Sequence, residues 1–319
     1  MILDDLLGIE EEIYLVEPGF YSQKTIMTTI SYLKDIRDVM KENEIHLRTI
    51  RITDGTKTTG LAIFNEKTEE VPIDFWSIFL SSITNQSADE FESLANLILD
   101  KNQPDRVIEV ANDSMNDALI EYYSLLLVNR ETCDECTMPL ESYGSIYTKA
   151  RINRLSDLLE KLAQKGISID GDVLEICCGN GMSTIVLHDL GIYPTTIEYE
   201  KCTVCQGLAH NVLDPKKSIV MDATTLSSFF KPERFDGVVG FMLGTIYEFN
   251  KDMWARMMFE SAKVAKDGAL MLFTVNGKSE MDILESALRM IGIEGEVMDN
   301  TDEFGIYDQW VFIGRKAKK

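Results

Sequence analysis

The residues best suited to chemistry lie in one short segment, 173–184, which reads Val-Leu-Glu-Ile-Cys-Cys-Gly-Asn-Gly-Met-Ser-Thr. An apolar run carries Glu175 near its end, and the Gly179-Asn180-Gly181 turn and an amphipathic stretch follow. This order predicts a strand, a tight turn and the start of a helix, which is the layout of a nucleotide-binding loop. Glycines in such a turn let the backbone approach a ligand closely.

Two further acids follow the next two apolar runs. Glu198 ends the run 193–198, 23 positions after Glu175, and Asp222 closes the run 217–221. An acid about 20 residues beyond such a loop accepts hydrogen bonds from ribose hydroxyls in dinucleotide folds. The carboxylate of Asp222 could accept from an exocyclic amine such as that of adenine. The three acids therefore predict a nucleoside ligand at the strand ends.

The loop does not fit a dinucleotide. Thr184 stands where a dinucleotide loop has its third glycine, and Glu175 would lie beside the pyrophosphate. A carboxylate at the base of the loop suits a cationic ligand instead.

With these features, residues from about 143 to 315 resemble a class I S-adenosylmethionine-dependent methyltransferase domain. Cys178 falls where the first motif of that family often has cysteine, whereas Cys177 replaces its usual first glycine. Five segments carry the resemblance: Glu-Ile-Cys-Cys-Gly-Asn-Gly at 175–181, Thr-Ile-Glu at 196–198, Val-Met-Asp-Ala-Thr at 220–224, Phe-Asp-Gly-Val-Val at 235–239 and Val-Ala-Lys-Asp-Gly-Ala-Leu at 264–270.

The resemblance implies that S-adenosylmethionine is the cofactor, and it implies which residues bind it. Glu175 and the backbone of 179–181 would hold its methionine part, and Glu198 its ribose. Asp222 and Ala223 would hold the adenine, with Tyr199 packed against it unless that ring serves only packing. The implied cofactor-binding set is Glu175, Cys177, Cys178, Gly179, Asn180, Gly181, Glu198, Tyr199, Asp222, Ala223, Gly240 and Phe241, the last two closing the pocket near the sulfonium.

The methyl acceptor is harder to infer, because a sulfonium methyl is already activated and the protein mainly places a nucleophile in line with it. The loop 241–248 lacks the Asn/Asp-Pro-Pro-Tyr/Phe pattern of related amide and nucleobase methylating enzymes. Candidate catalytic residues are Tyr247, Glu248 and Tyr147; the alternative for Glu248 is a solvated carboxylate at a helix start. Tyr147 and Arg151 lie one helical turn apart and could face the carboxylate of the cofactor.

Three functions stay open from the sequence. The first is methyl transfer to a small-molecule or protein acceptor. The second is transfer of the aminopropyl or aminobutyryl arm of the same cofactor. The third is a non-catalytic scaffold that binds the cofactor and a partner.

Cysteine spacing raises one further alternative. Cys133 and Cys136 form one Cys-x-x-Cys pair and Cys202 and Cys205 another. Four thiolates could hold zinc or an iron–sulfur cluster. Small buried side chains explain the second pair equally well, and we expect no metal and reduced cysteines.

The elements that must position these residues alternate between strand and helix. Expected helices follow Gly181, Lys201, Thr225, Lys251 and Ser279. Strands are expected at 172–177, 193–198, 217–221, 236–241, 268–275, 293–299 and 307–314. The short connection between the last two makes them antiparallel. The predicted fold is α/β, Rossmann-like: a doubly wound, mostly parallel seven-stranded sheet with an antiparallel edge strand.

A smaller α+β domain is expected before it. Its predicted elements are a strand at 13–17, a helix at 24–42, a hairpin at 46–53 and 58–65 around Asp54-Gly55, and helices at 74–99 and 114–128. The segment 133–144 is the candidate linker, which gives domains 1–142 and 143–319. We expect the first to select the acceptor or a partner.

Charge narrows the range of partners. The 319-residue chain has a formal net charge of −22, and residues 1–150 hold 28 acidic against 12 basic side chains. An acidic surface repels phosphate backbones, which disfavours nucleic-acid substrates; the alternative is that the charge serves solubility alone. No apolar run approaches the ~18 residues of a membrane span, and the N-terminus is acidic at once. A cytoplasmic location is expected, and the oligomeric state stays open.

Overall fold

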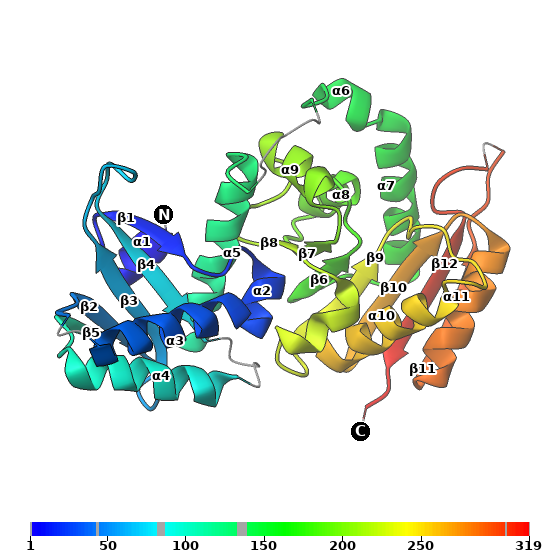
Figure 1. Cartoon of the computed structure of the whole chain (residues 1–319). Helices are drawn as coiled ribbons and strands as arrows, with labels where there is room; N and C mark the ends of the chain where they lie inside the picture. The colour runs from blue at the N-terminus through cyan, green and yellow to red at the C-terminus, as the bar shows by residue number, and fades with distance from the viewer. Residues whose placement is uncertain (1, 43–44, 82–86, 133–138, 304, 319) are drawn as a thin grey trace. The chain divides into compact units, whose positions relative to one another are not determined.

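The computed structural model describes residues 2–42, 45–81, 87–132, 139–303 and 305–318 (Figure 1). The chain forms two compact units, residues 1–123 and 124–319. The division falls within helix α5 (Asn112–Val128). The domain boundary expected at 142/143 follows a segment, 133–138, that lies outside the described residues, and it stays a prediction.

Among the described residues of the first unit, five strands form one mixed sheet in the order β1-β4-β3-β2-β5. The predicted hairpin is confirmed: β2 and β3 are antiparallel, and Asp54 Oδ1 accepts hydrogen bonds from the backbone N–H groups of Thr56 and Lys57 at 2.9 and 2.8 Å. The elements are α1 (Ile2–Leu7), β1 (Glu12–Leu15), α2 (Phe20–Thr25), α3 (Met27–Glu42), β2 (Thr49–Thr53), β3 (Thr58–Asn65), β4 (Phe75–Leu80), α4 (Ala88–Lys101) and β5 (Arg106–Glu109).

Two predictions for this unit are wrong in detail, and one strand is missing from the predicted elements. The first part of the helix expected at 74–99 is strand β4, because a short apolar run fits either a strand or a buried helix. Strand β5 was not predicted. The helix expected at 24–42 is two helices, since Ile26 adopts a left-handed φ of 43° between α2 and α3.

The core of the first unit lies between α3, α4 and one face of the sheet. Both helices lie on the same side of the sheet in Figure 1. Leu33 of α3, Leu61 of β3 and Phe91 of α4 are all 0% exposed. Burial of such side chains contributes roughly 2 kcal/mol each, which gives this unit a core of its own.

Among the described residues of the second unit, seven strands form one sheet in the order β11-β12-β10-β9-β6-β7-β8. The strands are β6 (Val173–Ile176), β7 (Thr195–Glu198), β8 (Ser218–Val220), β9 (Phe235–Gly240), β10 (Ala265–Val275), β11 (Ile293–Asp299) and β12 (Trp310–Lys316). Strands β6 to β10 are parallel to their neighbours among themselves, and β12 is antiparallel to both β10 and β11. The predicted mostly parallel sheet is confirmed, and its antiparallel strand belongs to the hairpin β11–β12 at one edge.

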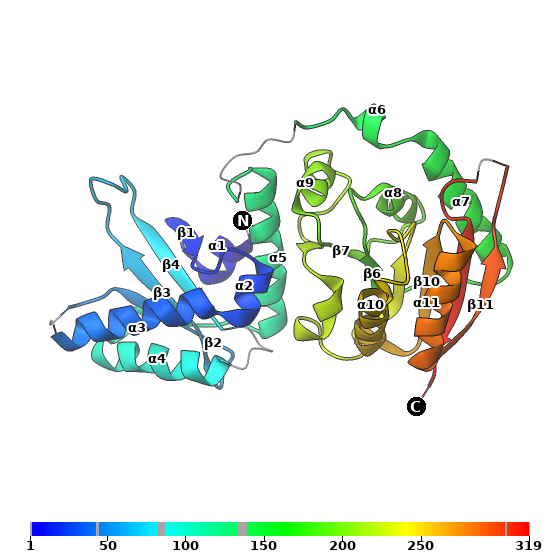
Figure 2. The same ribbon diagram turned by 45° about the vertical axis from the view of Figure 1, so that its right-hand side comes forward.

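Helices cover both faces of this sheet. The helical elements are α6 (Tyr143–Ile146), α7 (Lys149–Gln164), α8 (Met182–Asp189), α9 (Lys201–Ala209), the 3-10 segment η1 (Ala223–Ser228), α10 (Lys251–Val264) and α11 (Lys278–Met290). Leucines of α7 pack with Leu187 of α8 and with Leu272 and Val311 of the sheet. Figure 2 shows α10 and α11 together on the opposite side. The expected doubly wound architecture therefore holds.

Among the described residues, no helix combines the length and the apolar character that crossing a bilayer requires.

Candidate nucleoside site

Strand order fixes where a ligand would bind. From β6 the chain moves outward through β7 to β8, and it then crosses to β9 on the other side of β6. A doubly wound sheet opens a crevice at such a switch point, outside the carboxyl ends of the strands. The loop 177–181 after β6 and the loop 241–248 after β9 both begin there.

The backbone of the first loop is left-handed at alternate residues. Cys177, Gly179 and Gly181 have φ values of 53°, 58° and 87°. Glycine adopts this conformation freely, whereas a side chain is strained there by about 1–2 kcal/mol. A Cβ at Gly181 would also lie 2.7 Å from Leu213 and 2.8 Å from Val212. The odd residue of the sequence motif, Cys177, therefore occupies a position that suits glycine.

Glu175 lies buried beneath the loop and contacts the helix that follows it. Its side chain is 0% exposed, and the hydroxyls of Ser183 and Thr184 donate hydrogen bonds to its two carboxylate oxygens, the second at 2.8 Å. Burial raises the pKa of Glu175 to about 7, against the lowering effect of these hydrogen bonds. Glu175 thus ties β6 to the first turn of α8, and its expected contact with the methionine part stays a prediction.

Thr184 is explained by the same contact. A glycine there, as in a dinucleotide loop, would remove one of the two hydroxyls that satisfy the buried carboxylate. Sequence reasoning missed this role of Ser183 and Thr184. The available signal was a pair of hydroxyl residues in the first helical turn beside an acid in a fully apolar strand.

Glu198 lies over the loop. Its Oε2 accepts the backbone N–H of Gly179 at 3.0 Å, and its Oε1 accepts those of Tyr199 and Glu200 at 2.7 and 2.9 Å. Hydrogen bonds from three backbone groups fix the carboxylate at the end of β7. This is one of the three acids that the sequence places at the strand ends.

Asp222 ends the next strand along and caps the segment after it. It is exposed, and its Oδ1 accepts the backbone N–H of Thr224 at 2.8 Å. Ala223 beside it is buried, and Tyr199 is 69% exposed. The exposed carboxylate keeps one oxygen toward solvent, while the ring of Tyr199 is open to contact.

The pKa of the Cys177 thiol is shifted by burial and by the acids around the loop. Burial raises its pKa to about 12, and the carboxylates of Glu198, Asp222 and Glu175 add to the rise. Its Sγ contacts Met257 Sδ at 3.6 Å. The thiol therefore lies within the field of all three acids, which favours a positive charge there.

Three residues of the cofactor-binding set implied by the resemblance pack in the interior of the unit. Cys178 is buried beside Leu208 and Leu213, and Phe241 is 2% exposed within the core beneath α7. A Cβ at Gly240 would lie 2.8 Å from Leu243, which already fills that space. All three pack against neighbouring side chains, and their contact with a cofactor stays a prediction.

The segment before α7 folds onto the glycine loop. Tyr147 is 4% exposed, and its hydroxyl donates to the carbonyl oxygen of Asn180 at 2.8 Å. Burial raises its pKa, which argues against a role as a base. Its ring packs against Tyr143 and His210. Tyr147 thus holds the loop through this hydrogen bond, and its candidacy as a catalytic residue stays a prediction.

Arg151 lies four residues further along the chain, in the first turn of α7. Its guanidinium is 5.4 Å from the centroid of the Tyr307 ring, and its charge lowers the pKa of both Glu175 and Asp308. Tyr147 and Arg151 were both expected to face the carboxylate of the cofactor. The Tyr147 hydroxyl contacts the backbone of the glycine loop, and the charge of Arg151 acts on Glu175 beneath the loop.

The other two catalytic candidates lie on the surface. Tyr247 is 53% exposed and stacks on Phe249, and Glu248 forms an ion pair with Lys251 at 2.7 Å. The ion pair is the arrangement expected of a solvated carboxylate at a helix start. Both side chains belong to the loop after β9, on the side where an acceptor would approach.

Comparison with known proteins was made against sequences and solved structures. No protein-family model matches the chain, and no curated protein matches it. Structural neighbours of this chain are class I S-adenosylmethionine-dependent methyltransferases. They cover about half of it.

Three of these neighbours show how low the sequence identity is. A methyltransferase from Clostridium acetobutylicum has 13% identity and a TM-score of 0.42, over 52% of this chain and 92% of its own. A putative methyltransferase from Methanococcus maripaludis has 13% identity and a TM-score of 0.43, over 58% of this chain and 97% of its own. The sugar N-methyltransferase KedS8 from a Streptoalloteichus species has 12% identity and a TM-score of 0.42, over 58% of this chain and 96% of its own. The fold assignment itself rests on the strand order and registers above.

The cysteine alternative is only partly visible. Cys202 and Cys205 lie on α9, and Cys205 Sγ is 3.5 Å from the carbonyl oxygen of Leu127. Cys133 and Cys136 lie outside the described residues. Within the described ranges, no group of three or more His, Cys, Asp or Glu side chains could hold a metal. A site shared by the two pairs stays a prediction.

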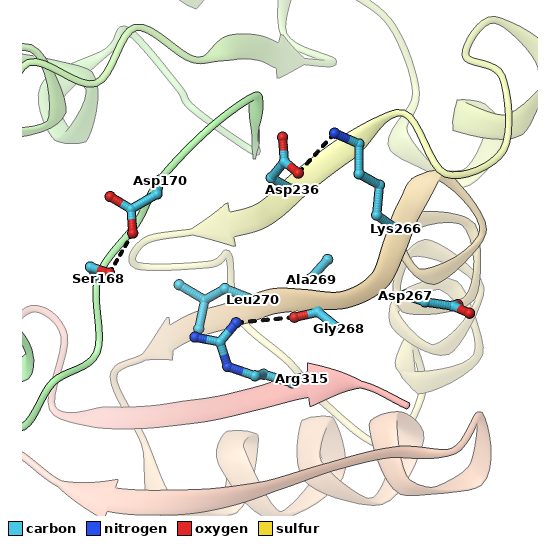
Figure 3. Close-up of a pocket in the computed structure, with 9 residues that line it drawn as sticks. All are labelled: Ser168, Asp170, Asp236, Lys266, Asp267, Gly268, Ala269, Leu270 and Arg315. Carbon is cyan, nitrogen blue, oxygen red and sulfur yellow. Dashed lines mark hydrogen bonds and ion pairs between the residues drawn. The ribbon is translucent and has the colours of Figure 1, made fainter. Parts of the chain in front are cut away.

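A cavity lies at the opposite edge of the sheet, where β9 and β10 begin (Figure 3). Asp236 forms an ion pair with Lys266 at 2.8 Å, and Arg315 donates to the carbonyl oxygen of Gly268 at 3.0 Å. Asp170 accepts a hydrogen bond from Ser168, and Asp267 forms an ion pair with Lys316 at 3.7 Å, so the charges that line the cavity are already partnered.

Proposed function

We propose that this chain is an S-adenosylmethionine-dependent methyltransferase that acts on a small molecule or a protein side chain. The carboxylate of Glu198, fixed over the glycine loop by three backbone N–H groups, carries the proposal. Such a carboxylate is oriented before a ligand arrives, and it can accept hydrogen bonds from both ribose hydroxyls.

The charge of the site supports this cofactor over a dinucleotide. Burial is the main cause of the raised pKa of the Cys177 thiol, and the nearby carboxylates of Glu198, Asp222 and Glu175 add to the rise, which makes the local potential negative. A sulfonium is attracted by such a potential and a pyrophosphate is repelled. Among the described residues, the nearest atom to a Cβ added at Gly179 would be Cγ2 of Thr203 at 3.9 Å, so the backbone of the loop leaves room for a ligand.

The roles of the residues follow. Glu198 would bind the ribose, Asp222 the adenine amine, and Arg151 the carboxylate of the methionine part. Glu175 and Tyr147 position the loop. When bound, S-adenosylmethionine supplies an activated methyl group, and the protein aligns the acceptor with it and excludes water.

The acceptor is constrained by charge and by exposed aromatic rings. The loop 241–248 presents Tyr247, stacked on Phe249, which is 84% exposed. The acidic first unit favours a neutral or cationic acceptor, or a basic protein partner. We propose that this unit selects it.

Isothermal titration calorimetry tests the cofactor. S-adenosylmethionine and S-adenosylhomocysteine should bind, and NAD⁺ should not, since its pyrophosphate would meet the acids. Tight binding of NAD⁺ without binding of S-adenosylmethionine would contradict the proposal.

Product analysis then separates the reactions. Incubation with candidate acceptors should release S-adenosylhomocysteine. Release of methylthioadenosine would instead indicate transfer of the aminopropyl or aminobutyryl arm. Binding without turnover on any acceptor would favour the non-catalytic scaffold.

A further inference from the structure

The turn that leads into β12 is strained at two consecutive residues. Tyr307 and Asp308 have left-handed φ values of 63° and 46°. Each such residue costs on the order of 1–3 kcal/mol and persists only where its surroundings enforce it. The turn is enforced by buried amides: Gln309 Nε2 donates to the carbonyl oxygens of Ile306 and Tyr307 at 2.9 and 2.8 Å, and Asn300 Nδ2 donates to that of Asp308 at 2.9 Å.

The strain places an acid in the interior. The Asp308 side chain is 0% exposed, and its Oδ1 accepts a hydrogen bond from the hydroxyl of Thr274 near the end of β10. Among the described residues its Oδ2 is buried without a hydrogen-bond partner. Burial raises the pKa of Asp308, against the lowering effect of the Thr274 hydroxyl, of the backbone N–H of Met242 and of the charges of Arg151 and Arg154. A buried acid is expensive to keep, so a role beyond packing is indicated.

The hydroxyl of Thr274 passes the contact to the loop after β9. Its Oγ1 accepts the backbone N–H of Met242 at 2.6 Å, and its carbonyl oxygen accepts that of Leu243 at 2.9 Å. A hydroxyl has one hydrogen and two lone pairs. Because Asp308 takes the hydrogen, a lone pair is turned toward Met242, which itself has a left-handed φ of 50°.

Met242 is the point at which the chain leaves β9 for the acceptor side. The next residue, Leu243, fills the space above Gly240, and the backbone N–H of Ile246 donates to Glu280 Oε1 at 3.1 Å. These contacts hold the loop 242–248 at both ends.

We propose that Asp308 is a positioning residue for the transfer reaction, acting through the Thr274 hydroxyl to hold the loop 242–248 as the acceptor-side wall of the site. The inference rests on the proposed function, because it assigns that wall to a methyl acceptor. The strained turn of the β11–β12 hairpin is then the device that delivers the carboxyl group to Thr274.

The test compares paired variants. Asp308→Asn keeps an oxygen that can accept from the hydroxyl, and Asp308→Leu does not. Thr274→Ser keeps the hydroxyl, and Thr274→Val removes it. Amide hydrogen exchange of 242–248 is measured against that of α11, with circular dichroism to verify folding and calorimetry with S-adenosylhomocysteine.

Exchange of 242–248 should be at least about 10-fold faster in Asp308→Leu and Thr274→Val and within about threefold of wild type in Asp308→Asn and Thr274→Ser, since one hydrogen bond is worth about 1 kcal/mol and a buried unmet partner more. Affinity for S-adenosylhomocysteine should change less than threefold.

Unchanged exchange in folded Asp308→Leu, or fast exchange in Asp308→Asn, overturns the inference. If the leucine variant does not fold, the two Thr274 variants decide: equal exchange in both overturns the inference. Failure of wild-type protein to bind S-adenosylhomocysteine would overturn the proposed function instead, and it would leave the exchange result intact.

Discussion

Glu198 reaches back from the end of β7 to the glycine loop, where its Oε2 accepts the backbone N–H of Gly179 at 3.0 Å. This hydrogen bond joins the acid and the loop that would together hold a nucleoside. Because the same carboxylate also accepts two backbone N–H groups of its own turn, it has little freedom left to lose on binding. The site is therefore organised before a ligand enters.

The first prediction concerns pH and Glu175, whose pKa is raised by burial to about 7 from an ordinary value of 4.5. Below the ordinary value, both the folded and the unfolded protein hold this proton. As the pH rises toward 7 the unfolded chain releases it first, so the free energy of unfolding falls by up to about 3 kcal/mol and is level above.

Glu175→Gln should remove that fall, because glutamine does not titrate. Urea unfolding between pH 4.5 and 8 measures it, with the exposed Glu200→Gln as the control. The variant should gain stability relative to wild type as the pH rises. Parallel curves for wild type and Glu175→Gln would show that Glu175 is not a buried titrating acid.

The second prediction concerns the strained Cys177. At a φ of 53°, glycine relieves the strain and a β-branched side chain increases it. Cys177→Gly should stay within about 1 kcal/mol of wild type, and Cys177→Val should lose about 2 kcal/mol of unfolding free energy. Valine at the exposed Cys202 should cost less than about 1 kcal/mol. Equal stability of the glycine and valine variants at Cys177 would contradict the left-handed assignment.

The third prediction concerns the contact between Tyr147 and the loop. Tyr147→Phe removes the hydrogen bond to the Asn180 carbonyl oxygen and leaves the ring packing intact. It should cost about 1 kcal/mol of unfolding free energy and weaken S-adenosylhomocysteine binding several-fold. Tyr143→Phe, on a ring that is 48% exposed, should change neither. A Tyr147→Phe variant that binds as wild type does would separate this segment from the site.

The sheet of the second unit could be predicted because each of its buried strands is an apolar run between turns. The strand expected at 236–241 is β9 (Phe235–Gly240), and that at 293–299 is β11 with the same bounds. In the first unit, the run Phe75–Leu80 has no such context, and its assignment to a helix was wrong. Pairing with β1 and β3 decides its structure, and pairing is not visible in a short apolar run.

For the candidate site, the positions of the acids could be predicted and the directions of the side chains could not. Glu198 and Asp222 were located because strand ends are visible in sequence. The direction of a side chain is not: Phe241 faces the core, and the Glu175 carboxylate turns to Ser183 and Thr184. The contact of Asp308 with Thr274 joins residues 34 positions apart, and it depends on left-handed φ values at Tyr307 and Asp308, residue types that rarely adopt them.

The most direct test of the account is the affinity of Glu198 variants for S-adenosylmethionine, measured by calorimetry. Glu198→Ala should bind about 100-fold more weakly than wild type, since two hydrogen bonds to a charged group are worth about 3 kcal/mol. Glu198→Gln should be intermediate, and Glu200→Ala, two residues further on, should match wild type. A folded Glu198→Ala variant that binds S-adenosylmethionine as tightly as wild type would contradict the account.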